Sequence, residues 1–475
     1  FDFSTQEVAG RSFFPTPGLY VTNVQAFFVL WAICALAPGS AEGCSVSPPK
    51  RYTLRFIVCR PMRGGSQVGR IEAVWLFIIL RAGSAFLHAL IFTVNMVYQA
   101  ETVGLSPLQL VLVGTTLELS VFLFEAPTGI LADVYSRRLS VILGVGLMGI
   151  GFVIEGSFPF FAAVLLNQVL WGLGYTFTSG ATEAWLSDEI GEAAAGPVFL
   201  RASQFSQVAG LAAIPLSVAL ASVSIQLPIV LGGLLFVGLA LFLWWKMPET
   251  GFTPTPPAER NSWAQMAETA RSGLAMVRSR PLLQLILAVS LVVGLYSEGY
   301  DRLWTPHLLD NFTFPVLLGL QPIVWFGVIR AGSTLLSIVA TEMARRGGAT
   351  EKGGRLVGVM LALDAFMLAA LLALAWANSF WLALTALWLF STARTTLGPL
   401  ESAWIVRHTG GRARATAISF AGQLNAIGQV VGGPFVGWIG TIVSLPVALS
   451  LSALLMSPIL LLRASARRRE NENNR

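Results

Sequence analysis

From Glu72 onward, the chain alternates long apolar runs with short polar breaks. Runs of about 20 residues cross the hydrocarbon core of a bilayer when they form α-helices. Twelve such segments are predicted, six on each side of one long polar break. They cover residues 72–99, 107–131, 139–156, 159–185, 197–221, 225–246, 281–300, 315–343, 355–376, 378–404, 413–439 and 441–463. The pattern predicts an all-α polytopic membrane protein with two pseudo-symmetric six-helix halves.

The same pattern divides the chain into five parts. Residues 1–70 form an N-terminal extension that is expected outside the fold, although its marginal apolar run is also compatible with a signal peptide or an extra helix. The two halves cover residues 71–246 and 281–463. They are joined by a Pro-rich linker, residues 247–280, which is expected on the cytoplasmic side and carries an amphipathic stretch. A basic polar tail, residues 464–475, ends the chain.

Composition supports a membrane protein. Of the 475 residues, 55% are hydrophobic and 12% are charged, whereas about a quarter of residues are charged in soluble domains. The net charge of +6 does not indicate nucleic-acid binding, because the basic residues cluster between apolar segments, where they set membrane orientation. The lipid bilayer is therefore the expected surrounding, in an inner or plasma membrane.

Lys and Arg predict the orientation of the segments. The proposed inner loops carry nearly all of the loop cations, whereas the outer loops carry only Arg302. Because cytoplasmic loops are enriched in Lys and Arg, both ends of the twelve-helix core are expected in the cytoplasm. The inner cations are Arg137, Arg138, Arg201, Lys246, Arg260, Arg271, Arg278, Arg280, Arg345, Arg346, Lys352, Arg355, Arg407, Arg412 and Arg414.

The sequence contains none of the patterns sought for an enzyme or a metalloprotein. Its three cysteines, Cys34, Cys44 and Cys59, precede the first segment, and its three histidines are scattered. Neither a nucleophile elbow nor a phosphate-binding loop is present. We therefore expect no metal, no cofactor and no enzymatic or ATP-driven activity.

A short polar hinge separates the second and third segments. Gly129 is expected to let two helices approach closely, and Asp133 to cap the N-terminus of a neighbouring helix. Arg137 and Arg138 are expected to hold the turn on the cytoplasmic side. Glu125, the first residue of the hinge stretch that ends at Arg138, is expected to join this gate through Arg137 or Arg138. The combination predicts a gate.

The two halves repeat weakly. The acid and basic pair of the hinge recur as Glu342, Arg345 and Arg346. Gln207-Val-Ala-Gly likewise matches Gln429-Val-Val-Gly. A third match aligns Trp171, Gly180, Glu183 and Trp185 with Trp388, Gly398, Glu401 and Trp404. Two repeated halves that enclose a site near the bilayer midplane are typical of secondary transporters.

The hinge resembles the Gly-x-x-x-Asp-x-x-x-Arg-Arg loop of the major facilitator superfamily, with Gly129, Asp133, Arg137 and Arg138 at its defined positions. The resemblance covers about residues 71–463. It implies alternating access driven by an ion gradient or by the substrate's own gradient. The expected partners are a small-molecule substrate and protons, and the chain is expected to be a monomer.

The chain departs from the family at two motifs. Gln168 stands where the fourth helix often carries an Arg, so a proton role cannot be assigned to it. The fifth segment also lacks the Gly-Pro-x-x-Gly-Gly of drug antiporters.

Proton-coupled efflux of small amphipathic compounds is the predicted function. Uptake of a small organic anion or metabolite is the alternative, ahead of a non-transporting membrane sensor.

Ionisable residues inside the first half are candidates for function, because a charge at mid-bilayer is costly unless it is paired or hydrated. Arg81, His88 and Asn95 share one face of the first segment and are expected to line a cavity, with His88 either packing there or binding substrate or a proton. Glu118, near mid-depth, is the proton-coupling candidate, or it neutralises Arg81. Glu183 is expected at the gate.

Arg330 and Arg394 are the deepest cations of the second half. Left unpaired, they would attract an anionic or zwitterionic substrate; pairing of Arg394 with Glu401 or Glu118 is the alternative. Asp364 has no partner that the sequence indicates. The predicted substrate cavity is completed by amide side chains, namely those of Gln207, Gln423, Asn425 and Gln429.

Overall fold

The computed structural model describes residues 67–254, 271, 277–278, 280–316, 322–347, 353–409 and 411–473. The expected extension up to residue 66 and most of the linker, including nearly all of its amphipathic stretch, lie outside these residues. The helices described below belong to one compact unit, Gly65–Arg475. Within the described residues every regular element is a helix.

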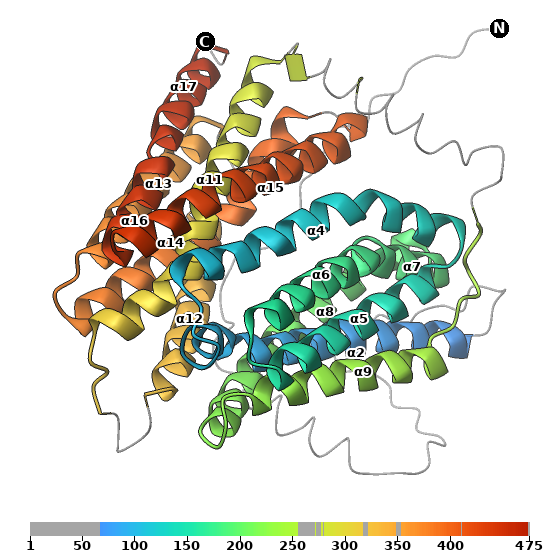
Figure 1. The fold of residues 1–475 in the computed structure, drawn as a ribbon. Coiled ribbons are helices and arrows are strands. Elements are labelled where there is room, and N and C mark those ends of the chain that lie inside the picture. The colour runs from blue at the N-terminus through green and yellow to red at the C-terminus, as the bar shows by residue number, and fades with distance from the viewer. Residues whose placement is uncertain are drawn as a thin grey trace, which may run out of the picture. The chain divides into compact units, whose positions relative to one another are not determined.

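Helices α2 to α9 make up the first half, drawn in blue to green in Figure 1. Its first membrane helix is built from α2, α3 and a π-helix, η1, and its fourth from α6 and α7. The bounds are α2 Gln67–Phe92, α3 Asn95–Val97, η1 Tyr98–Thr102, α4 Pro107–Val134, α5 Arg137–Ser157, α6 Phe161–Thr178, α7 Ala181–Ile190, α8 Glu192–Ala221 and α9 Leu227–Lys246.

Helices α11 to α17 make up the second half, drawn in yellow to red in Figure 1. Its last membrane helix is built from α16 and α17. The bounds are α11 Pro281–Asn311, α12 Val324–Arg346, α13 Gly353–Ala375, α14 Phe380–His408, α15 Gly411–Ile442, α16 Leu445–Met456 and α17 Pro458–Asn473. Each of the twelve predicted segments thus corresponds to one helix or to two or three consecutive ones, and among the described residues nine spans are long and apolar enough to cross a membrane by themselves.

Local chemistry explains where several helices begin and break. Ser106 opens α4 with a capping box shared with Gln109. The side chain of Ser136 accepts a hydrogen bond from the backbone N–H of Leu139 at 2.9 Å, so Ser136 caps α5. Gly180 has a φ of 73°, a conformation that favours glycine, and it divides the predicted fourth segment into α6 and α7.

The close helix contacts occur at glycines other than the one predicted. A Cβ added at Gly149 on α5 would lie 2.8 Å from the carbonyl oxygen of Gly233 on α9, so these two backbones touch. Gly144 on α5 and Gly174 on α6 make a similar approach. Gly129 has no neighbouring atom within 4 Å of such a Cβ, so the prediction of a close approach at Gly129 is wrong.

Contacts between the two halves concentrate at one end of the bundle, where the start of α4 meets the end of α15. The backbone N–H of Leu108 donates to the Thr441 hydroxyl at 2.9 Å. Gly437 packs against Val111. We call this the contact end, and the opposite end, which carries the hinge, the hinge end. Toward the hinge end, a cavity of about 810 Å³ lies beside α12 and is lined by Gln207, Ser337 and Glu342, among others.

Candidate functional site

A central cavity of about 500 Å³ lies between α11, α12 and α14 and is closed on one side by α2. Three of its lining side chains are charged, namely Asp301, Arg330 and Arg394. Most of the others are aromatic or small and polar: Phe92, Thr93, Tyr300, Trp304, Phe326, Ser333, Ser391 and Thr395. A mostly apolar pocket with a few converging polar groups is the usual form of a small-molecule site.

Arg394 is paired with a carboxylate inside this cavity. Its two terminal nitrogens donate to the two carboxylate oxygens of Asp301 at 2.5 and 2.8 Å. Its guanidinium also lies 5.7 Å from the ring centre of Tyr300. The predicted partners Glu401 and Glu118 are therefore both wrong, because Asp301 reaches Arg394 from the neighbouring helix α11. Tyr300, Asp301 and Trp304, which follow one another closely on α11, all line the cavity.

Arg330 differs from Arg394, because it forms no ion pair among the described residues. Its Nη1 donates to the backbone carbonyl of Phe92 at 3.1 Å. Phe92, Trp304 and Phe326 line the same cavity. Counting Asp301 and Arg394 as neutralised by each other, the cavity carries one net positive charge beside aromatic surface.

A second cavity, of about 370 Å³, lies within the first half and contains two residues of the predicted polar stripe. Arg81 lies 3.3 Å from the Glu183 carboxylate, so the alternative in which Glu118 neutralises Arg81 is wrong. His88 Nδ1 lies 2.8 Å from the carbonyl oxygen of Ser84. The His88 ring also packs on Phe92, Trp171 and Phe236. The third stripe residue, Asn95, is buried away from both cavities.

Glu118 lies on α4, half-buried, and makes no ion pair among the described residues. It lies within electrostatic range of Glu298, Arg302 and Asp301 on α11 of the other half. Arg302 is already paired with Glu298 at 2.8 Å, and both side chains are buried. Asp301 is likewise paired with Arg394, so Glu118 is the one carboxylate of this group without an ion-pair partner among the described residues.

The predicted amide side chains do not line the central cavity. Gln207 lies in the hinge-end cavity. Gln423 donates to Glu125 at 2.9 Å, so the predicted pairing of Glu125 with Arg137 or Arg138 is wrong and Glu125 bridges the two halves instead. The other two amides bond within the second half: Asn425 donates to the Ser290 carbonyl and Gln429 donates to Asn425.

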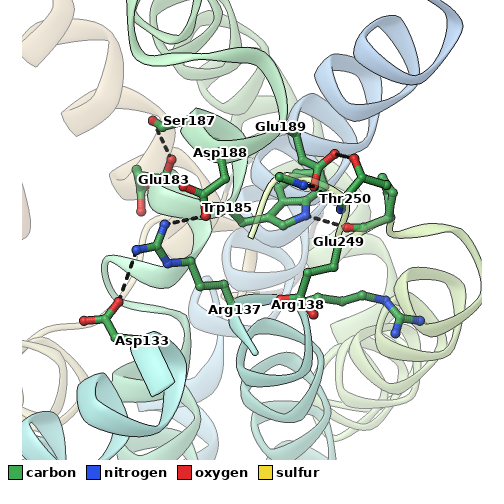
Figure 2. Close-up of polar contacts among 12 residues, drawn as sticks. Asp133, Arg137, Arg138, Glu183, Trp185, Ser187, Asp188, Glu189, Glu249 and Thr250 are labelled. Atoms are coloured by element: carbon green, nitrogen blue, oxygen red, sulfur yellow. Dashed lines mark hydrogen bonds and ion pairs between the residues drawn. The ribbon is translucent and has the colours of Figure 1, made fainter. Parts of the chain in front are cut away.

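Figure 2 shows the hinge and the side chains around it. Arg137 donates to Asp188 on α7 at 2.5 Å and lies 3.3 Å from Asp133. Arg138 donates to the Trp244 carbonyl on α9 at 2.5 Å. The hinge arginines thus tie the start of α5 to α7 and α9 within the first half.

We call these contacts of Arg137 and Arg138 with α7 and α9 the clamp. The segment that follows α9 adds further contacts to it. Glu249 accepts hydrogen bonds from the Ser136 hydroxyl at 2.7 Å and from the backbone N–H of Arg138 at 2.9 Å. Trp185 donates to the Pro248 carbonyl at 2.7 Å, and Glu189 accepts two bonds from Thr250 (Figure 2). The beginning of the linker is therefore fixed both to the hinge and to α7.

The clamp predicts unequal effects for the two acids that contact Arg137. Asp188 is 24% exposed and Asp133 is 61% exposed, so water replaces the lost interaction less well at Asp188. We expect Asp188→Asn to destabilise the protein by about 1.5–3 kcal/mol and Asp133→Asn by at most about 1 kcal/mol. Thermal unfolding midpoints in detergent measure both, with the exposed Glu192→Gln as the control. Equal midpoints for the two Asn variants would contradict the larger contribution of the Arg137–Asp188 contact to stability.

Sequence reasoning missed two buried polar centres. One surrounds Glu155 on α5, which is fully buried. The other joins Asp364 and Glu401 to Arg463 on α17, a helix that continues beyond the approximate predicted segment 441–463 to Asn473. A charged residue inside an apolar run was the available signal for Glu155.

Comparison with known proteins identifies the fold independently. The model of the Major Facilitator Superfamily matches residues 74–363. A relative described as an uncharacterized MFS-type transporter, YxaM of Bacillus subtilis (strain 168), is 25% identical over 210 residues, which are 43% of this chain and 51% of the relative. The chain thus matches about half the length of that relative.

Solved structures with the same fold are transporters. The crystal structure of the nucleoside transporter NupG has a TM-score of 0.66 at 15% identity and covers 83% of this chain and 98% of its own. A bacterial homolog of the human lysosomal transporter Spinster, in an inward-facing and unoccupied conformation, has a TM-score of 0.63 at 16% identity, with 85% and 96% covered. At these identities the likeness shows the fold alone.

Proposed function

The chain belongs to the major facilitator superfamily, and on that premise we propose that it is a secondary active transporter whose central cavity binds a small amphipathic organic anion. Binding there, with access alternating between the two membrane faces, would carry the anion across. The hinge clamp and the Glu125–Gln423 contact lie at the hinge end, where such alternation would open and close the halves.

Arg330 is the observation that carries this proposal. A guanidinium inside the membrane is costly unless a negative charge or good acceptors compensate it, and the half-buried guanidinium of Arg330 has only the Phe92 carbonyl among the described residues. A carboxylate or another singly charged anion would supply the missing partner. Because Arg394 is already neutralised by Asp301, one negative charge is enough. The aromatic lining would bind the apolar body of the same molecule.

Proton coupling and export complete the proposal. Glu118 is the coupling group, because it lies half-buried between the halves and forms no ion pair among the described residues. Export of amphipathic compounds, across an inner or plasma membrane with both ends of the helical core in the cytoplasm, remains the preferred direction. Uptake of a small organic anion is the alternative that the same cavity supports, and transport in vesicles of known orientation distinguishes the two.

The proposal predicts a selective loss of anion binding in Arg330→Gln. Loss of one charge-assisted hydrogen bond, about 1.5–3 kcal/mol, should weaken binding of aromatic monocarboxylates about 10–100-fold. Binding of the matching neutral amides should hardly change. Trp304 lines the cavity, so its fluorescence reports on binding.

Arg81→Gln is the matched control, because Arg81 lies in the other cavity and is paired with Glu183. It should leave the affinity for monocarboxylates unchanged. Equal losses in the two variants, or an unchanged affinity in Arg330→Gln, would remove Arg330 from the substrate site.

A further inference from the structure

A fully buried carboxylate lies at the contact end of the first half and lines none of the three cavities described above. Glu155 on α5 accepts hydrogen bonds from Gln99 Nε2 at 2.7 Å and from Asn167 Nδ2. Tyr98 donates its hydroxyl to the backbone carbonyl of Glu155 at 2.5 Å. Among the described residues Glu155 forms no ion pair. The donors to its carboxylate are thus all neutral, and Arg302, which lies within electrostatic range, is already paired with Glu298.

The Asn95 side chain also lies within hydrogen-bonding reach of the Glu155 carboxylate. Three amide oxygens of this cluster have no hydrogen-bond partner among the described residues. They are Asn95 Oδ1, Gln99 Oε1 and Asn167 Oδ1. These side chains are all at most 2% exposed. A buried polar atom without a partner costs about 1–3 kcal/mol, so three of them around one carboxylate call for a common explanation.

The first membrane helix is interrupted where it supplies two of these amides. Helix α2 ends at Phe92, α3 carries Asn95, and the π-helix η1 carries Gln99. Single π-helical turns often occur at functional sites. In transporters, interrupted membrane helices are a recurring place for coupling-ion sites. The interruption here is independent evidence that this cluster binds something.

We propose that Glu155, Asn95, Gln99 and Asn167 form a binding site for a monovalent metal cation, with Na⁺ as the ion. A proton on Glu155 would satisfy one amide oxygen, whereas a metal cation is coordinated by several oxygens at once. Rotation of an amide group by 180° exchanges its nitrogen and oxygen, so the same side chains can hold the free carboxylate or surround a cation. Carboxylate and amide oxygens are the ligands preferred by hard cations.

The charge and packing of the cluster select the ion. One carboxylate balances one positive charge, whereas a divalent cation would leave a net charge buried in an apolar surrounding. The cluster is tightly packed, since Asn167 touches the backbone at Gly151, and this favours Na⁺ over the larger K⁺. None of the four side chains lines the central cavity or the cavity that contains His88. The Na⁺ site is therefore separate from the substrate cavity and from Glu118.

Thermal unfolding of the purified full chain in detergent tests the site without any substrate. Replacing choline chloride with NaCl at constant ionic strength should raise the unfolding midpoint in a saturable way, because a ligand that binds only the folded state stabilises it. KCl should have a smaller effect. Glu155→Gln should abolish the Na⁺-dependent shift. Glu101→Gln is the control, because Glu101 is an exposed carboxylate on η1, the π-helix that carries Gln99; this variant should keep the shift.

Gln99→Met provides a second variant in case Glu155→Gln does not fold, because it keeps the carboxylate and removes one amide oxygen. It should raise the Na⁺ concentration at half-maximal shift by at least about 10-fold. No Na⁺-specific shift in the wild type, or an undiminished shift in both site variants, would overturn the proposal. A midpoint that responds to pH and not to Na⁺ would show that Glu155 holds a proton, and would equally overturn it. Because no transported compound is used, failure here leaves the proposal for the central cavity untouched.

Discussion

Replacing Arg463 with Met is expected to lower the free energy of unfolding by about 3–5 kcal/mol, the usual cost of removing one member of a buried ion pair. Arg463 is fully buried on α17 and binds both Asp364 and Glu401. Its guanidinium also lies 5.6 Å from the Trp404 ring centre. Without it, two carboxylates would lose their only ion-pair partner among the described residues. The thermal midpoint and the yield of folded protein in detergent should both fall sharply.

Neutralising the two acids should reverse this loss. Adding Asp364→Asn and Glu401→Gln to Arg463→Met removes the uncompensated charges and should recover most of the midpoint. Arg468→Met is the matched control, because Arg468 is exposed on the same helix, and its effect should be within about 0.5 kcal/mol of zero. A normal midpoint for Arg463→Met, or a triple variant no more stable than the single one, would contradict the buried pairing.

Glu118→Gln is expected to abolish proton-driven accumulation of substrate in vesicles while exchange of substrate across the membrane continues. A glutamine cannot release a proton, but exchange requires no net proton movement. Glu118 forms no ion pair among the described residues, so its neutralisation leaves no cation unpaired. Radiolabelled substrate taken up with and without a pH gradient measures the two activities separately.

Glu183→Gln is the comparison variant, because Glu183 is paired with Arg81. It should reduce accumulation and exchange together, since it disturbs a structural pair. Gradient-driven accumulation that persists in Glu118→Gln would transfer the coupling role to another carboxylate, with Glu183 the next candidate.

The positions of the helices could be read from the sequence, because the length of an apolar run is a local property. Two residues that begin or interrupt helices also act locally, Ser136 as the cap of α5 and Gly180 through its positive φ between α6 and α7. Helix breaks within a span were less visible: the interruption of the first membrane helix at Phe92 coincides with no proline or glycine.

The partners of the membrane charges could not be read from the sequence, because they depend on how the helices are rotated and which of them are neighbours. Arg394 and Glu401 are two turns apart on one helix, yet Arg394 forms an ion pair with Asp301 and Glu401 forms one with Arg463. Gly129 fits the family pattern but faces open space. The candidate cavity was anticipated only at Arg330 and Arg394, because its aromatic wall comes from side chains scattered over three helices.

Transport by the reconstituted protein tests the central claim most directly. Proteoliposomes that contain the wild type should accumulate a labelled aromatic monocarboxylate when a proton gradient is imposed, and should stop when the gradient is dissipated by an uncoupler. Arg330→Gln should lose accumulation and exchange together, whereas Glu118→Gln should lose accumulation alone. If the wild type moves no anion from such a panel, or if Arg330→Gln moves it as fast as the wild type, the central cavity is not the anion-binding transport site proposed here.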